Sequence, residues 1–242
     1  MQKYSIFNLI KNAFSGHQNW DLAWKDPTPK KEYDVVIIGG GGHGLATAYY
    51  LAKEHNITNV AIIEKGWIGG GNVGRNTTII RSNYMHDDNA LFSEFGMDLW
   101  RKMSQDLNYN VMFSPRGIIN LAHSDAQMNI YARRGNSMRL NGIDAVLLNR
   151  EQVKEIIPMA DFSENVRFPI FGALMQPSAG TARHDAVAWG YARQADSMGV
   201  DIIQNCEVTG FDVLGGKING VRTSRGDIKV KKIGLCVAGS TN

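Results

Sequence analysis

Two short stretches of the sequence combine residue types and spacings that chemistry can use. The first is GGGGHG, in which Gly39, Gly41 and Gly44 match the pattern G-x-G-x-x-G. The second is GTARHDAVAWGYARQA (residues 180–195), which places His184 where a loop ends and a helix begins. A glycine loop before a helix can bind phosphate, whereas a helix start normally prefers Ser, Thr, Asp or Asn. The role of each stretch depends on the elements around it.

The glycine pattern stands between elements that suit a nucleotide-binding fold. YDVVII (33–38) is a β-branched run typical of a buried parallel strand, and LATAYYLAKEH (45–55) is typical of a helix. NVAIIEK (59–65) predicts a second strand that ends on Glu64, 20 residues after Gly44. This order and spacing predict a dinucleotide-binding domain. The alternative is a glycine-rich turn in another kind of α/β protein.

Each residue of the pattern has a physical task in such a domain. Gly39 permits a tight turn, Gly41 lets the backbone approach a pyrophosphate, and Gly44 lets the helix pack closely on the sheet. The N–H groups at the helix start face the phosphates. Glu64 would accept hydrogen bonds from a ribose hydroxyl, which suits NAD or FAD and argues against NADP.

The stretch after Glu64 favours FAD over NAD. KGWIGGGNVGRNTTIIRSNY (65–84) holds a second glycine loop, whereas a plain NAD domain would continue into a helix. A polar segment of this kind can wrap the far side of an extended FAD. The alternative is a surface loop whose glycines only form turns. The polar side chains of the segment 65–84 that could contact FAD are those of Asn72, Arg75, Asn76, Thr77 and Thr78.

Four longer runs resemble one family of flavoproteins. They are GGGGHGLATAYYLAKEH, GGGNVGRNTTIIRSNY, LNYNVMFSPRG and GTARHDAVAWGYAR. Similar runs occur in the glycine-oxidase and sarcosine-oxidase branch of the FAD-dependent amine oxidoreductases, and most closely in the beta subunits of heterotetrameric sarcosine oxidases. The likeness covers nearly all of the chain. It implies an α/β fold: a Rossmann-like FAD-binding domain of the D-amino-acid-oxidase type with an inserted, here incomplete, α+β substrate domain. Together with the glycine loops it implies non-covalent FAD held by Gly39, Gly41, Gly42, His43, Gly44, Glu64, Lys65, Asn72, Arg75, Asn76, Thr77, Thr78, Ile79 and Val208.

Arg81 is the candidate for binding a substrate carboxylate. A small amino acid presents two carboxylate oxygens, and the guanidinium fork matches them. The family places such an arginine at the end of a run similar to IIR, which here ends on Arg81. The alternative is a surface arginine or one linked to a phosphate, and Arg75 is the better candidate for the phosphate side. His43 is expected to contact FAD, and His123 to have a structural role.

His184 is the candidate attachment point of a second flavin. If Thr181 caps the helix, His184 is its third residue, where the helix N-terminus favours a neutral imidazole that can act as a nucleophile. The resemblance implies that this imidazole carries a covalent FMN, with Arg183 and the helix N-terminus near the phosphate. The structural alternative is a partly exposed histidine in a first helical turn.

The resemblance also implies a reaction and partners. FAD would oxidise sarcosine, FMN would pass the electrons to oxygen, and the imine would yield glycine with formaldehyde or methylene-tetrahydrofolate, besides hydrogen peroxide. An alpha subunit would meet the chain at the FMN, and tetrahydrofolate and NAD could bind to a partner subunit. One alternative is a single-flavin dehydrogenase or oxidase of the same fold. The other is a catalytically incomplete nucleotide-binding fragment.

Domain boundaries follow from these assignments. We expect an N-terminal arm and linker (1–32), a first segment of the FAD-binding domain (33–82), the start of the substrate domain (83–183) and a second FAD-binding segment (184–242). The rest of the family fold would follow Asn242. In the arm, Ile6, Leu9, Ile10 and Phe14 have helical spacing, which favours an amphipathic helix packed on the body or on a partner over a mitochondrial presequence.

Composition excludes several other classes. The formal net charge is +3 with scattered Lys and Arg, so no basic face for nucleic acid is expected. The densest run, KVKK (229–232), suits the solvated face of a strand. No apolar run approaches the ~20 residues that span a bilayer. Cys206 and Cys236 lie in apolar, strand-like runs and are expected to be buried free thiols in the cytoplasm. No spacing indicates a metal site.

The remaining elements are predicted from periodicity and caps. A helix is expected over 85–107, with an apolar stripe packed in the core, and a strand–turn–strand hairpin over 111–122. The stripe consists of Leu91, Phe92, Phe95, Leu99 and Met103. Ser124 and Asn149 are expected to cap two helices. A strand is expected over 171–177, and five short strands after residue 199, with turns at 215–216 and 225–226.

Overall fold

A computed structural model describes residues 5–18, 22–163 and 165–240 of the protein, and the chain divides into two compact units. Unit 1 comprises Met1–Thr77, Ser104–Val111 and Arg183–Asn242. Unit 2 comprises Thr78–Met103 and Met112–Ala182. Both units therefore consist of segments that are distant in the sequence.

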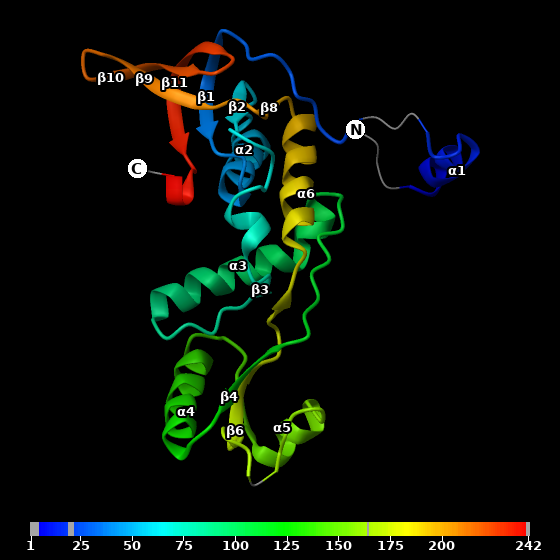
Figure 1. The fold of residues 1–242 in the computed structure, drawn as a ribbon, viewed down its shortest axis with the longest axis vertical. Coiled ribbons are helices and arrows are strands. Elements are labelled where there is room, and N and C mark those ends of the chain that lie inside the picture. Colours follow the sequence, from blue (N-terminus) through cyan, green and yellow to red (C-terminus); the bar gives the residue numbers. More distant parts are fainter. Residues whose placement is uncertain (1–4, 19–21, 164, 241–242) are drawn as a thin grey trace. The chain divides into compact units, whose positions relative to one another are not determined.

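Unit 1 is built on a six-stranded sheet with the order β8–β2–β1–β11–β10–β9 (Figure 1). The first four strands in this order are parallel, while β10 and β9 are antiparallel to their neighbours. The strands are β1 (Glu32–Ile38), β2 (Val60–Ile63), β8 (Asp201–Ile203), β9 (Val208–Leu214), β10 (Lys217–Thr223) and β11 (Gly226–Leu235). The short helices η1 (Asn72–Arg75) and η2 (Ala238–Ser240) complete the unit. The predicted parallel strands at 33–38 and 59–65 are thus confirmed.

Two helices, α2 (Gly42–His55) and α6 (His184–Ser197), lie side by side against the sheet of unit 1 (Figure 1). The rings of Tyr49 and Tyr191 meet edge to face between them, with centroids 5.4 Å apart. The other face of the sheet carries a separate cluster of buried side chains, which includes Val36, Ile63, Ile203 and Val230. Burial on both faces explains why β1 and β2 are continuous apolar runs.

Unit 2 contains a three-stranded antiparallel sheet with the order β4–β6–β5. Leu174 of the central strand packs with Met138 of α4, while the next residue back, Ala173, packs with Val153 of α5. Because successive strand residues point to opposite faces, the two helices cover opposite faces of the sheet. The elements are β3 (Ile79–Ile80), α3 (Asp87–Asp106, in this unit up to Met103), β4 (Ile118–Ala122), α4 (Asp125–Leu140), β5 (Val146–Asn149), α5 (Arg150–Ile156), β6 (Gly172–Gln176) and β7 (Gly180–Thr181).

The predicted caps are confirmed, and the predicted hairpin is wrong. The Ser124 side chain accepts a hydrogen bond from the Gln127 N–H, and Asn149 forms a complete capping box with Gln152. Within 111–122 only the second strand forms, as β4, and it pairs with β6. Ser114 pairs instead with Thr181. The local turn signal was real, but the partners of these residues come from distant parts of the chain.

The predicted apolar stripe of α3 is only partly confirmed: Met103 is buried and Leu99 is half-buried, but the other three residues are exposed. Leu91, Phe92 and Phe95 are 52%, 78% and 64% exposed, and the residues that α3 buries are Ala90, Met97 and Met103. Ala90 packs with Met138 and Leu174 in the core of unit 2. The face of α3 that turns to this core is therefore the one that carries alanine, not the one that carries Phe92 and Phe95. Helical spacing identified an apolar face without showing which face packs.

Four strands follow residue 199 where five were predicted. β11 is one continuous strand of 10 residues, because its first part pairs with β10 and its later part with β1. The turn at 215–216 forms as predicted, the second turn lies at 224–225 because Gly226 already belongs to β11, and Lys229, Lys231 and Lys232 are exposed. Both cysteines are free thiols, but neither lies in a strand, and Cys236 is only half-buried.

The N-terminal segment forms the predicted helix, α1 (Ile6–Phe14), with Ser5 as its cap. None of its side chains is buried; Phe7 and Phe14 are 78% and 90% exposed. Packing of this helix on the body is therefore not seen among the described residues, whereas Lys25 and Asp26 of the following linker bond to Asp196 and Arg225. Across those residues, no helix combines the length and the apolar character that crossing a bilayer requires.

Candidate functional site

The first glycine loop of unit 1 lies at the carboxyl end of β1. The Gly39 N–H donates to the Ile63 carbonyl at 2.8 Å, and the Cys236 N–H donates to the Ile38 carbonyl at 2.8 Å. The ends of β2 and β11 therefore flank the loop on its two sides. In the strand order β2–β1–β11 the chain path reverses at β1, and ligands of open α/β sheets bind at such a switch point.

Two glycines of the loop are required by close backbone contacts. Gly39 has φ 110°, and a Cβ there would lie 2.4 Å from the Cys236 carbonyl oxygen. A Cβ on Gly44 would lie 2.0 Å from the Gly39 carbonyl oxygen and 3.3 Å from Ile37 Cγ2. A side chain at either position is incompatible with this loop and with the close packing of α2 on β1.

Gly41 is different, because the space beside it is open. The nearest heavy atom to a Cβ there would be Val73 Cγ2 at 3.9 Å. Gly41 is the N-cap of α2 and has no side chain to cap the helix, so the first N–H groups of α2, including those of Gly42 and His43, are not capped. An open approach to uncapped N–H groups at a helix N-terminus fits a pyrophosphate.

Glu64, directly after β2, holds the glycine loop in place. Its Oε2 accepts a hydrogen bond from the Gly40 N–H and its Oε1 accepts one from the Gly66 N–H, both at 2.8 Å. A carboxylate offers about four acceptor sites, so about two remain for ribose hydroxyls. The predicted ribose contact is compatible with this geometry. The sequence reasoning missed the second task, which is to tie the two glycine loops to one carboxylate.

The second glycine loop runs from Gly66 into η1. The Gly69 N–H donates to the Gly40 carbonyl at 3.0 Å, which brings this loop against the first one. Asn76 Nδ2 donates to the Val73 carbonyl at 2.8 Å and closes the short helix. Four predicted FAD contacts of this loop are exposed: Asn72, Arg75, Asn76 and Thr77.

The other predicted FAD contacts are dispersed. Lys65 is exposed after Glu64, and Val208 is the half-buried first residue of β9. His43 is the second residue of α2, and its side chain lines a shallow hollow along that helix with Tyr50 and His55. Thr78 and Ile79 belong to unit 2, where Ile79 pairs with Thr181.

His184 is the first residue of α6, not the third. The N-cap is Arg183, and Thr181 lies in β7 because it pairs with Ile79 and with Ser114. The strand pairing therefore removes Thr181 as a cap and corrects the predicted helix start. His184 is partly exposed, yet its Nδ1 is buried and has no hydrogen-bond partner among the described residues.

The residues next to His184 pair with each other. Arg183 Nε lies 2.8 Å from Asp185 Oδ1, and the Ala186 N–H donates to the same oxygen at 2.8 Å. Burial alone would raise the pKa of Asp185, but the hydrogen bonds from Arg183 and Ala186 hold that pKa below its usual value. The hydrogen bond to Asp185 also raises the pKa of the Arg183 guanidinium. Arg183 is thus engaged by a carboxylate and not freely available to a phosphate.

Arg81 lies in unit 2, directly after β3. It is half-buried, its Nη1 donates to Asn83 Oδ1 at 2.5 Å, and its guanidinium stands 4.5 Å from the centre of the Tyr84 ring. Among the described residues no carboxylate lies within 4.0 Å of it. An arginine that stacks on an aromatic ring and lacks an acidic partner fits the predicted role of binding a carboxylate.

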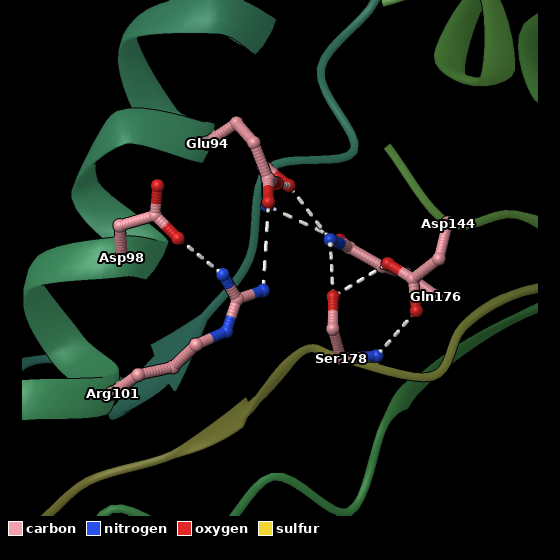
Figure 2. A network of polar contacts seen from close by, with 7 residues as sticks. Glu94, Asp98, Arg101, Asp144, Gln176 and Ser178 are labelled. Atoms are coloured by element: carbon pink, nitrogen blue, oxygen red, sulfur yellow. Dashed lines mark hydrogen bonds and ion pairs between the residues drawn. The ribbon is translucent and has the colours of Figure 1, made fainter. Parts of the chain in front are cut away.

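A polar network centred on the buried Ser82 and Gln176 fixes the backbone beside Arg81, and Figure 2 labels its members Glu94, Gln176, Ser178 and Asp144. Ser82 and Gln176 are both fully buried: the Ser82 N–H donates to Gln176 Oε1 at 3.1 Å, and Gln176 Nε2 donates to Ser82 Oγ at 2.6 Å. Ser82 Oγ in turn donates to Glu94 of α3 at 2.5 Å. On the other side, Gln176 donates to Ser178, which is bound by Asp144. The network ties the segment after β3 to β6 and α3.

We expect Gln176→Leu to lower the free energy of unfolding of unit 2 by about 2 kcal/mol, because it leaves the buried N–H of Ser82 without an acceptor, while the Ser82 hydroxyl keeps its bond to Glu94. Urea unfolding measures this difference. Asn129→Leu, on an exposed position of α4 in the same unit, is the control and should change stability by less than about 0.5 kcal/mol. Equal effects of the two substitutions would contradict a structural role for the network.

The contacts of His123 are those of a structural histidine. His123 follows β4, and its Nδ1 lies 3.1 Å from the Pro169 carbonyl oxygen. Its ring also meets Phe168 edge to face. These contacts favour the predicted structural role.

Comparison with known proteins decides the family. A model of the FAD-dependent oxidoreductases matches residues 34–241, which is most of the chain. The chain belongs to this family. The chain is 59% identical over 240 residues to the sarcosine oxidase subunit beta of Rhizobium meliloti. It is 52% identical over 242 residues to that of Rhodobacter capsulatus. These matches cover 99% and 100% of the chain and 58% of each relative, so the chain spans little more than half of their length.

A solved structure shows the same fold. The crystal structure of L-proline dehydrogenase from P. horikoshii is 28% identical and superposes with a TM-score of 0.79, covering 86% of this chain and 54% of that protein. The predicted fold class is thereby confirmed for this FAD-dependent oxidoreductase. FAD also fits the residues present, because Gly39 and Gly44 leave no room for a side chain while the approach to Gly41 and the start of α2 stays open.

Several residues of the site in unit 2 could not be found from the sequence. Three residues from different elements meet here: Asn83 binds Arg81, Arg134 binds Asn83, and Gln176 binds Ser82. Gln176 is 94 residues from Ser82, and Arg134 is 51 residues from Asn83. Ser82 and Asn83, which follow the run IIR, are both fully buried. Two polar residues in succession do not by themselves indicate burial, so the sequence offers no usable signal for this site.

Proposed function

We propose that the chain is the FAD-binding part of a flavoprotein that oxidises sarcosine. The observation that carries this proposal is Arg81, a half-buried guanidinium without an acidic partner among the described residues, in a chain that closely resembles sarcosine oxidase beta subunits. An arginine of this kind suits the carboxylate of a small N-methyl amino acid. The predicted domain roles follow: unit 1 binds FAD and unit 2 begins the substrate domain.

The residues of the chain bind and orient, and the cofactor supplies the redox chemistry. Bound FAD accepts a hydride equivalent from the carbon next to the amine nitrogen. The N-terminus of α2 and the open backbone at Gly41 hold the pyrophosphate, and Glu64 holds the ribose. The exposed polar loop around Arg75 covers the far side of the cofactor. Arg81 binds the substrate carboxylate and so fixes which carbon is presented for oxidation.

His184 is proposed to carry a covalent FMN. Its Nδ1 is buried and makes no hydrogen bond to the described residues, so the imidazole is not committed to a structural contact. In this proposal the electrons reach oxygen by way of FMN, and hydrogen peroxide forms. The imine gives glycine and formaldehyde, or methylene-tetrahydrofolate where a partner subunit binds tetrahydrofolate. An alpha subunit completes the FMN site, and NAD binds to a partner.

A single-flavin dehydrogenase of the same fold is the second candidate. The observation that favours it is the pairing of Arg183 with Asp185 at 2.8 Å, which engages the cation nearest to His184. A covalent FMN would then need a partner chain to bind its phosphate. In the single-flavin candidate, electrons leave FAD for a carrier protein.

The proposed function is tested with the complete protein assembled with its partners. Sarcosine added without oxygen should bleach the visible absorbance of the flavin. Arg81→Gln should raise the KM for sarcosine by about 100-fold, because it removes a charge-assisted contact to the carboxylate. Arg133→Gln, on an exposed position of α4, is the control and should leave the KM unchanged.

Two results would contradict the proposal. If sarcosine leaves the flavin of the wild-type assembly fully oxidised, sarcosine is not the substrate. If Arg81→Gln binds sarcosine as the wild type does, the carboxylate is held elsewhere.

A further inference from the structure

Two arginines of unit 2 converge on one buried residue. Asn83 is fully buried; its Oδ1 accepts a hydrogen bond from Arg81, and its backbone carbonyl accepts one from Nη2 of Arg134. Arg81 comes from the segment after β3, and Arg134 comes from the middle of α4. Asn83 therefore binds two guanidiniums that come from different elements of the same unit.

Two hydrogen-bond donors at this place have no acceptor. Asn83 Nδ2 and Arg134 Nε are both buried and have no partner among the described residues. The amide orientation follows from the donor it faces, because Arg81 can only donate and the Asn83 oxygen must therefore point towards it. More than nine in ten buried polar groups in proteins are satisfied. Two unsatisfied donors in one place indicate that an acceptor binds there.

The charge at this place points to the kind of acceptor. Burial lowers the pKa of Arg134, and the nearby charge of Arg81 lowers it further. Within the described part of the chain, no carboxylate comes within 4.0 Å of either guanidinium. Neighbouring cations in a partly buried place repel each other unless an anion lies between them. An anionic acceptor would relieve this repulsion and satisfy both donors.

The site is held rigidly enough to select a ligand. Ser82, which stands between Arg81 and Asn83 in the sequence, forms hydrogen bonds with both Gln176 and Glu94. The Tyr84 ring packs against the Arg81 guanidinium, with its centre 4.5 Å from Arg81 Cζ. Groups fixed in this way lose little conformational entropy when a ligand binds.

We propose that Arg81, Asn83 and Arg134 form one binding site for a small carboxylate, in which Arg134 and the Asn83 amide share the anion with Arg81. The identification of this carboxylate as that of the amino acid substrate rests on the proposed function. Two arginines and an amide select for a free carboxylate, so amines without one, and amides or esters of the amino acid, are excluded from the site.

The test uses acetate as the probe and acetamide as its uncharged counterpart, at constant ionic strength in chloride. Acetate should raise the melting temperature of the wild-type chain, and acetamide should not. Arg134→Gln should bind acetate about tenfold more weakly, the usual effect of losing one charge-assisted hydrogen bond. Arg134→Lys should recover part of this affinity, and Arg133→Gln should behave as the wild type.

A second variant separates loss of acetate binding from loss of stability, because it is expected to stabilise the protein. Asn83→Asp has nearly the same shape and puts a carboxylate oxygen against the Arg81 guanidinium, on the residue whose carbonyl Arg134 contacts. It should raise the melting temperature without acetate and abolish the acetate-dependent increase. If Asn83→Asp lowers stability, or if Arg134→Gln binds acetate like Arg133→Gln, the cluster is not an anion site. The same conclusion follows if Arg134→Gln lowers the melting temperature and leaves the affinity for acetate unchanged.

The two proposals can fail separately. If acetate binding depends on Arg134 but sarcosine does not bleach the flavin of the assembled protein, the anion site stands and the sarcosine proposal fails. If sarcosine bleaches the flavin but acetate binding does not depend on Arg134, only the present inference fails.

Discussion

Gly41→Ala is expected to fold normally and to bind FAD about 100-fold more weakly, because the new methyl group would keep the pyrophosphate from about two of its charge-assisted hydrogen bonds to backbone N–H groups. Gly41 has φ −84°, and a Cβ there would meet no atom closer than 3.9 Å. The substitution therefore does not disturb the protein itself. It fills the space through which the pyrophosphate approaches the start of α2.

Gly44→Ala should fail for a different reason. Its Cβ would lie 2.0 Å from the Gly39 carbonyl oxygen, so the glycine loop must move, at a cost of about 2 kcal/mol in stability, and FAD binding should be lost. Gly96→Ala is the control: it lies within α3 with no heavy atom in reach of the new Cβ, and alanine favours a helix.

FAD titration followed by flavin fluorescence, with thermal unfolding in parallel, measures both effects. If Gly41→Ala bound FAD with wild-type affinity, the pyrophosphate would not lie at this loop. If Gly44→Ala were as stable as Gly96→Ala, the close approach of Gly44 to the Gly39 carbonyl would be wrong.

His184→Ala is expected to remove all covalently bound flavin from the assembled enzyme. The reason is that no other nucleophile is proposed for the FMN, and Nδ1 of His184 is buried without a partner in the described part of the chain. Acid precipitation separates the two cofactors. The washed wild-type pellet should stay yellow, the His184→Ala pellet should be colourless, and FAD released into the supernatant should be equal in both.

The matched control is His86→Ala, which replaces an exposed histidine and should leave the pellet yellow. Colour that survives His184→Ala would show that the flavin is attached elsewhere. A colourless wild-type pellet would favour the single-flavin dehydrogenase.

Local signals predicted the elements that depend on local contacts. The glycine loop, β1, α2 and β2 formed where strand, turn and helix patterns placed them. The caps Ser124 and Asn149 were also correct, because an N-cap bonds only to N–H groups within its own first turn. The helix of the N-terminal arm was correct for the same reason.

Several predictions that depended on distant partners were wrong. Thr181 looked like a helix cap until its pairing with Ile79 placed it in a strand, and this moved the start of α6 to His184. Ser114 pairs with Thr181 instead of forming a hairpin with β4. In α3 the exposed Phe92 and Phe95 show that apolar spacing does not identify the face turned to the core.

By itself the sequence determined the dinucleotide-binding loop, since Gly39, Gly41, Gly44 and Glu64 are close enough along the chain for their spacing to imply their geometry. The tertiary structure alone decided the site in unit 2. Arg134 reaches the carbonyl of Asn83 across 51 residues, and Gln176 reaches Ser82 across 94. These contacts depend on the path of the chain through β3, α4 and β6, and no local spacing encodes that path.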